Sequence, residues 1–267
     1  MSLASVWLVG CGNMGAAMLA RWLGAGVDAT SITVVDPALA QAPVGVRLLR
    51  RLPEEPAPDV LVLAIKPQQL AAFAAGVGGW RGQPPVILSI LAGVELSSLQ
   101  QQLGSTRICR AMPNLPVAIG KGVVALYAGA AGVDTGLKAA AERLMQPLGH
   151  VEWMTDESLF DAVTALSGSG PGFVFRFVDA LAAAGMAIGL PADMAARLAL
   201  ATVEGSAQMA ASASDPPAML ADRVASKGGS TREGLNVLDD GEALVALLTA
   251  TLAAAKRRNG ELAALAR

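Results

Sequence analysis

Short apolar runs rich in β-branched residues occur only in the first 160 residues of this 267-residue chain. Six of these runs predict strands, at residues 6–10, 32–36, 60–65, 86–90, 107–111 and 122–127. Continuous apolar runs are typical of strands that are covered on both faces. Because the runs alternate with helical or loop stretches, they predict a parallel, doubly wound sheet. Residues 41–58 contain four prolines, so the helix expected there is short or missing.

The strand signal disappears from residue 156 onward, and helical patterns replace it. We expect helices near residues 156–166, 171–189, 191–212, 216–225, 231–240 and 242–265, separated by glycine- and proline-rich turns. The sequence therefore predicts an α/β amino-terminal domain of doubly wound, Rossmann-type architecture over residues 1–158. An all-α carboxy-terminal domain is expected over residues 159–267.

The predicted helix at 171–189 is apolar on nearly every side, since Arg176 and Asp179 are its only charged residues. Such a helix should be buried all round. A domain of about 100 residues can hardly enclose it alone, which indicates a partner subunit. A membrane span is the alternative, and the two interior charges count against it. Uncharged residues 1–20 also reach the length of a span, but their glycines and the lack of a preceding basic region argue against an anchor.

Composition excludes several function classes. Hydrophobic residues make up 53% of the chain, so it can offset the entropy cost of folding and is not disordered. The 20 basic and 22 acidic residues are spread evenly, so no basic face for nucleic acid is expected. Two distant cysteines and a single histidine provide neither a disulfide framework nor a zinc-type ligand set, and no metal site is expected. A reducing, cytoplasmic setting is consistent with this cysteine usage.

A glycine-rich loop follows the first predicted strand and precedes a helical pattern. In that context the sequence G-x-G-x-x-G predicts a dinucleotide-binding loop. Gly10 would permit the tight turn, Gly12 would let the backbone approach a pyrophosphate, and Gly15 would let the helix pack on the strand. A glycine turn without a ligand is the alternative. The candidate cofactor-binding residues here are Gly10, Cys11, Gly12, Asn13, Met14 and Gly15.

Other predicted strand ends add candidate cofactor residues. Asp36 ends the second strand, 21 residues after Gly15, where an acidic side chain accepts hydrogen bonds from the adenosine ribose 2′-OH and repels a 2′-phosphate. This favours NADH, although Arg47, Arg50 and Arg51 could bind a phosphate instead. The two strand ends that follow contribute Ala64, Ile65, Lys66, Pro67 and Ala92.

Seven segments together resemble one family. These are GCGNMG (10–15), AIKP (64–67), AGV (92–94), RAMPNLP (110–116), SGSGP (167–171), GLP (189–191) and SKGGSTREGL (226–235). In this order and spacing they resemble pyrroline-5-carboxylate reductases, which catalyse the last step of proline synthesis. The resemblance implies NADPH or NADH as cofactor, Asn114 beside it, and a cyclic imino acid as substrate. It also implies a homodimer formed through the carboxy-terminal domain, with dimers assembled into rings in many members.

The loop SKGGST is the most specific of these motifs. Two glycines before a helix start leave backbone N–H groups pointing outward, which suits a carboxylate, and the Thr231 hydroxyl can contact a ring nitrogen. An ordinary helix cap is the alternative. The resemblance implies Thr231 as the catalytic residue, and Ser226, Lys227, Gly228, Gly229, Ser230, Thr231 and Ser169 as the substrate-binding residues. Lys227 replaces the family's usual proline, and Gly172-Phe173 replaces its usual Ala-Tyr.

The resemblance implies hydride transfer from the nicotinamide to the imine carbon of 1-pyrroline-5-carboxylate. A cyclic imine is partly protonated near neutral pH, so acid catalysis by the protein is less necessary than for a carbonyl. A β-hydroxyacid dehydrogenase is the nearest alternative, but it needs a lysine that residues 171–212 lack. A reductase of another cyclic imine and a non-catalytic nucleotide sensor remain as further alternatives.

Overall fold

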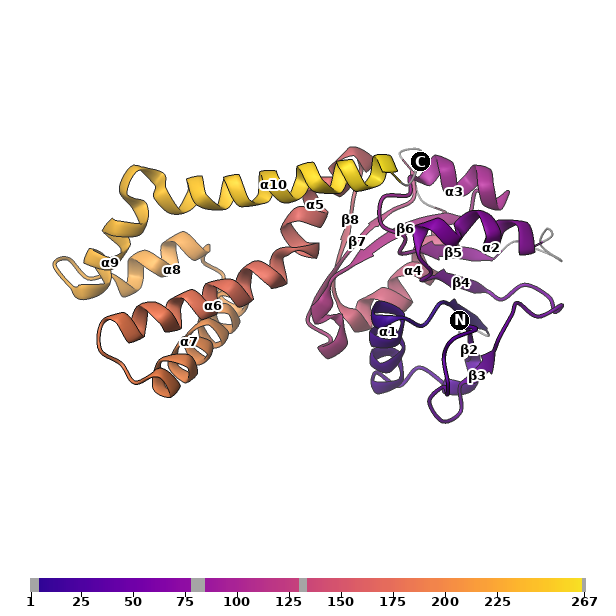
Figure 1. Cartoon of the computed structure of the whole chain (residues 1–267), viewed down its shortest axis with the longest axis horizontal. Helices are drawn as coiled ribbons and strands as arrows, with labels where there is room; N and C mark the ends of the chain where they lie inside the picture. Colours follow the sequence, from indigo (N-terminus) through magenta and orange to yellow (C-terminus); the bar gives the residue numbers. More distant parts are fainter. Residues whose placement is uncertain (1–4, 78–84, 130–133, 266–267) are drawn as a thin grey trace. The chain divides into compact units, whose positions relative to one another are not determined.

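The computed structural model describes residues 5–77, 85–129 and 134–265. The chain divides into two compact units (Figure 1). The first unit extends to Gly168 and includes the residues from Lys256 onward, and the second unit is Ser169–Ala255. The division therefore lies ten residues after the predicted boundary at 158/159. The reason is packing, because Phe160 is buried against the sheet and Asn114 Nδ2 donates a hydrogen bond to the Ser167 carbonyl.

The first unit contains one eight-stranded sheet in the order β3-β2-β1-β4-β5-β6-β7-β8. Its strands are β1 (Val6–Val9), β2 (Ile32–Val35), β3 (Arg47–Leu49), β4 (Val60–Leu63), β5 (Val86–Ser89), β6 (Ile108–Pro113), β7 (Gly122–Tyr127) and β8 (Gly149–Trp153). The α/β doubly wound architecture and all six predicted strands are confirmed. The sequence did not predict β3 and β8, which lie at the two edges of the sheet and are not fully buried.

One strand pair departs from the parallel prediction. β6 and β7 are antiparallel, with Arg110 opposite Tyr127. Only residues 114–121 connect them, and a parallel crossover needs a dozen residues or more. The short connection therefore forces the chain to turn back.

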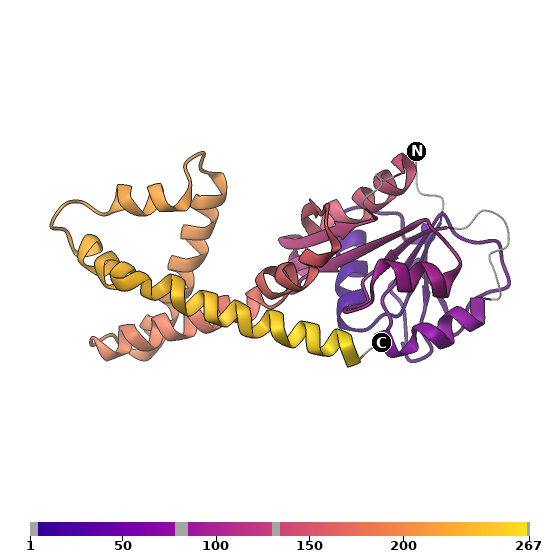
Figure 2. The same ribbon diagram turned by 90° about the horizontal axis from the view of Figure 1, so that it is seen from above.

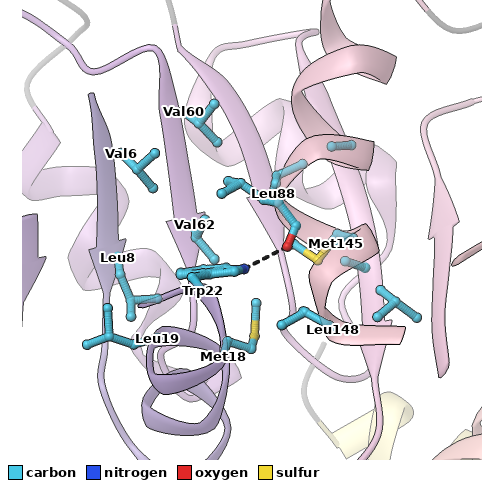
Figure 3. Close-up of a cluster of buried hydrophobic side chains, with 14 of the residues drawn as sticks. Val6, Leu8, Met18, Leu19, Trp22, Val60, Val62, Leu88, Met145 and Leu148 are labelled. Atoms are coloured by element: carbon cyan, nitrogen blue, oxygen red, sulfur yellow. Dashed lines mark hydrogen bonds between the residues drawn. The ribbon is translucent and has the colours of Figure 1, made fainter. Parts of the chain in front are cut away.

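Helices cover both faces of this sheet. They are α1 (Asn13–Gly24), α2 (Leu70–Val77), α3 (Leu96–Leu103), α4 (Thr135–Met145) and α5 (Phe160–Val163). Side chains of α1 and α4 pack in one core cluster, and those of α2 and α3 pack in another. The first cluster centres on Trp22, whose indole Nε1 donates a 2.6 Å hydrogen bond to the Leu144 carbonyl (Figure 3). Along β4, Val60 and Val62 face one cluster while Leu61 and Leu63 face the other, as the continuous apolar run predicted.

The second unit is built from helices, as predicted. These are α6 (Gly170–Ala187), α7 (Ala192–Ser212), α8 (Pro217–Val224), α9 (Ser230–Asp239) and α10 (Ala243–Leu265), the last of which ends in the first unit. α6 and α7 pack against each other as a hairpin (Figure 1), and α10 is one long helix (Figure 2). Among residues 5–77, 85–129 and 134–265, no helix has both the length and the apolarity that a membrane span requires.

The apolar helix α6 is not buried within the single chain. No residue of α6 is buried, and Phe175 and Phe177 are 61% and 52% exposed. As predicted, the domain does not enclose this helix by itself, so burial on all sides would need a partner subunit. Of the 23 large hydrophobic residues exposed in the described ranges, 18 lie in the second unit. Such a concentration of exposed apolar surface is typical of a protein interface.

Candidate active site

The glycine loop between β1 and α1 has the shape of a phosphate cradle. Gly10 has φ +89°, and a Cβ there would lie 2.6 Å from the Ala64 carbonyl oxygen. A Cβ on Gly15 would lie 2.6 Å from the Gly10 carbonyl oxygen, whereas one on Gly12 would meet nothing within 4 Å. Gly12 is also the N-cap of α1, with no side chain capping the helix. The first and third glycines are thus required by packing, and the second leaves open space beside a helix N-terminus that suits a pyrophosphate.

Asp36 supports this loop from the end of β2. One carboxylate oxygen accepts a 2.7 Å hydrogen bond from the Cys11 N–H, and the other accepts bonds from the N–H groups of Ala38 and Leu39. Partial burial opposes ionisation, but these three hydrogen bonds and the nearby Arg50 charge lower the pKa of Asp36. Burial, and then the charge of Asp36, raise the pKa of the Cys11 thiol. Asp36 is therefore ionised and Cys11 is a protonated, unreactive thiol at neutral pH.

Two of the three neighbouring arginines are occupied. Arg47 makes two hydrogen bonds of 2.7 and 2.8 Å to the Glu55 carboxylate. The Arg50 guanidinium donates to four backbone carbonyls in residues 36–40. Arg51 is exposed. A 2′-phosphate would therefore have to compete for Arg47 and Arg50.

A cavity of about 260 Å³ opens at the carboxyl ends of β4, β5 and β6. It is lined by Pro67, Gln68, Leu91, Ala92, Gly93, Arg110, Ala111, Met112, Phe160, Asp161, Thr164 and Asn259. In the strand order, β2 lies on one side of β1 and β4 to β6 lie on the other. Asp36 and the cavity therefore flank the glycine loop, as the two ends of an extended dinucleotide require.

The predicted substrate loop begins α9 in the second unit. Gly228 has φ +72°, and the Gly229 N–H donates a 2.9 Å hydrogen bond to the Ser226 carbonyl. The positive φ requires glycine at 228, and a Cβ on Gly229 would crowd Ser226 Oγ at 2.6 Å and the Ser226 carbonyl oxygen at 3.1 Å, so the turn is also tight there. Gly229 is the N-cap of α9 and no side chain caps it. The Thr231 side chain is exposed, so the loop presents the donors that a carboxylate needs.

Comparisons with known proteins point to one family. Residues 157–262 match the family described as pyrroline-5-carboxylate reductase dimerisation, and residues 5–93 match NADP oxidoreductase coenzyme F420-dependent. The chain is 36% identical to the pyrroline-5-carboxylate reductase of Pseudomonas aeruginosa, with 98% of each chain covered. The chain belongs to the pyrroline-5-carboxylate reductase family.

Solved structures of pyrroline-5-carboxylate reductases share the fold. The enzyme from Coxiella burnetii superposes with a TM-score of 0.89 at 30% identity, covering 97% of this chain and 98% of that one. The Plasmodium falciparum enzyme, solved with NADP bound, superposes with a TM-score of 0.80 at 24% identity, covering 98% and 99%. Both domains of the chain therefore follow the architecture of this reductase family.

The structure brings the predicted cofactor residues of the first unit to one edge of the sheet. Residues 10–15, Asp36, residues 64–67 and Ala92 all lie at carboxyl ends of parallel strands. Asn114 has a different setting, because it is buried and its amide group is occupied. Its Oδ1 accepts from the Val123 N–H and its Nδ2 donates to Ser167, both at 2.8 Å. Its contact with a cofactor stays a prediction, as does the substrate contact of Ser169, the N-cap of α6.

Of the twelve residues that line the cavity, sequence reasoning had proposed only Pro67 and Ala92, and the polar or aromatic ones that it missed include Arg110, Phe160, Asp161 and Asn259. Arg110 could have been noticed, because it is the one charge within the otherwise apolar strand β6, and a buried charge needs a partner. That partner, Glu157, carries no local signal, since it lies 47 residues further along the chain. Asn259 comes from the end of α10 and carries no such signal either.

Proposed function

We propose that this chain reduces 1-pyrroline-5-carboxylate to L-proline with a nicotinamide dinucleotide. The observation that carries the proposal is the pair of glycine-dependent loops, one before α1 and one before α9, on a chain that aligns over its whole length with a pyrroline-5-carboxylate reductase. The first loop fits a pyrophosphate and the second fits a carboxylate.

The cofactor residues have separate roles in this proposal. Backbone N–H groups at the start of α1 bind the pyrophosphate, and Asp36 faces the adenosine ribose. Pro67, Ala92 and Met112 enclose the nicotinamide in the cavity. When bound, the reduced cofactor supplies the hydride. The chain contributes orientation and exclusion of water, which is sufficient where the electrophile is already a protonated imine.

The substrate residues act through the loop at 226–231. N–H groups of this loop hold the substrate carboxylate, and the Thr231 hydroxyl contacts the ring nitrogen. Lys227 adds a positive charge where the family usually has proline, and so attracts the carboxylate. Ser169 is a second polar contact for the substrate.

NADH is used at least as well as NADPH in this proposal. The ionised Asp36 would face a 2′-phosphate with like charge. Arg47 and Arg50 already have partners. Of these three arginines, only Arg51 could bind the phosphate without first breaking a contact with another described residue.

The proposed working form is a homodimer built through the second unit, with dimers joined into a ring. The exposed apolar side chains of α6 and its neighbours supply the dimer contact. A reducing, cytoplasmic compartment stays a prediction from the two unpaired cysteines.

A steady-state assay tests the proposal. Purified protein is given 1-pyrroline-5-carboxylate with NADH or NADPH, and the loss of reduced nicotinamide is followed by absorbance. We expect saturable turnover, with a kcat/KM for NADH equal to or above that for NADPH. No turnover with either cofactor would contradict the proposed reaction, whereas a strong preference for NADPH would contradict only the role given to Asp36.

A further inference from the structure

Arg110 is a buried charge in the middle of β6, three strands away from β1 and the glycine loop that follows it. Its side chain is 8% exposed, and its Nη1 lies 2.5 Å from Glu157 Oε1. Its guanidinium carbon lies 3.9 Å from the centre of the Phe160 ring. A buried guanidinium carries a desolvation cost that only a well-placed counter-charge offsets. The ion pair therefore fixes Glu157 and Phe160 relative to β6.

Glu157 also caps a helix that is distant in sequence. Its Oε1 accepts a 2.7 Å hydrogen bond from the N–H of Leu96, the first residue of α3. The N-cap residue of α3, Glu95, makes no capping hydrogen bond with its own side chain. A carboxylate at a helix N-terminus satisfies an unpaired donor and complements the helix dipole. Glu157 thereby fixes where the loop at residues 91–95 enters α3.

These contacts connect three walls of the cavity. Ala92 and Gly93 lie in the loop before Leu96, and Ala111 and Met112 follow Arg110 along β6. The third wall begins at Phe160, just after Glu157. Each wall therefore lies within a few residues of Arg110, of Glu157, or of Leu96, whose N–H the Glu157 carboxylate holds.

We propose that Arg110 and Glu157 are positioning residues that set the spacing of these walls around the nicotinamide end of the cofactor. The proposal rests on the proposed function, which places the nicotinamide in this cavity. The pair acts through the backbone of residues 91–95 and 110–112, and the pyrophosphate contacts at the glycine loop do not depend on it. Loss of the pair should therefore weaken binding of the nicotinamide half alone.

Two nucleotides separate this effect from a general loss of structure. NADH contains the nicotinamide and ADP-ribose lacks it, so their dissociation constants are measured by calorimetry on the same protein. Glu157→Gln keeps an oxygen acceptor for the Leu96 N–H but removes the charge. Arg110→Lys keeps the charge but loses the planar fork of the guanidinium. Lys138→Met is the matched control, because it breaks a 3.9 Å ion pair with Glu142 on the surface of α4.

For Glu157→Gln and Arg110→Lys we expect the NADH dissociation constant to rise about tenfold and that of ADP-ribose to change by less than about twofold. Lys138→Met should change neither. An equal loss for both nucleotides would show that the pair only stabilises the fold, and no change in either would show that it has no role; both results overturn the proposal. A wild-type protein that binds neither nucleotide would overturn the proposed function and the positioning role together.

Discussion

Gly12 and Gly15 lie three residues apart and are required for different reasons. A Cβ on Gly15 would meet the Gly10 carbonyl oxygen at 2.6 Å, so Gly15→Ala should destabilise the fold by about 1–3 kcal/mol. A Cβ on Gly12 meets no protein atom within 4 Å, so Gly12→Ala should cost no more than about 1 kcal/mol. It should still abolish nucleotide binding, because the methyl group takes the place of the pyrophosphate. Thermal unfolding measures the stability of both variants, and calorimetry measures their nucleotide affinity. A Gly12→Ala variant that binds the nucleotide as tightly as the wild type would contradict the pyrophosphate site at this loop.

Asp36 has two roles, one toward the cofactor and one toward the loop. Asp36→Ser removes the charge that repels a 2′-phosphate, so the kcat/KM ratio should shift toward NADPH. The same change weakens the contact with the Cys11 N–H, so the kcat/KM for NADH should also fall. Steady-state kinetics with both cofactors measure this, and an unchanged ratio would mean that the arginines decide cofactor choice.

Thr231 offers a test of the substrate loop. Thr231→Val keeps the shape of the side chain but removes the hydroxyl, and losing one positioned hydrogen bond is worth roughly 1–3 kcal/mol of transition-state stabilisation. We expect kcat/KM for the imine to fall accordingly, while circular dichroism and the melting temperature stay those of the wild type. Thr135→Val, at the exposed start of α4 in the first unit, is the control. If kcat/KM does not change, Thr231 is not part of the site.

The central strands and the helices were predictable from sequence because their signals are local. β1, β2, β4 and β5 are continuous apolar runs, since helices cover both of their faces. The edge strands β3 and β8 have only one strand neighbour and mixed burial, so they lack that signal. The direction of β7 depends on the length of its connection to β6 rather than on its own residues.

In the candidate site too, only the features with a local signal in the sequence could be predicted. The two glycine loops could be identified from sequence because a positive φ or a close backbone approach leaves a local mark on residue choice. The ion pair between Arg110 and Glu157 joins β6 to a segment 47 residues away, and only the fold brings them together. Residues whose own backbone groups bind a ligand are therefore easier to predict here than residues whose side chains position the cavity walls around it.

The assembled protein should depend on the apolar surface of the second unit. Phe175 is 61% exposed on α6, and Phe175→Glu places a charge on that surface. We expect this variant to dissociate into inactive monomers, as measured by light scattering at micromolar concentration. Val44→Glu is the matched control, since Val44 is 96% exposed in the first unit and should tolerate the charge. A wild-type protein that is a stable, active monomer would contradict the proposal that activity needs a dimer formed through the second unit.

The central claim is that this protein transfers a hydride to the imine carbon of 1-pyrroline-5-carboxylate. Isotope transfer tests it most directly, with NADH carrying deuterium at both positions of nicotinamide C4. The account predicts L-proline with one deuterium per molecule, on the ring carbon next to nitrogen that does not bear the carboxylate, as read by mass spectrometry and NMR. Proline without deuterium, or oxidation of the cofactor without proline formation, would contradict it.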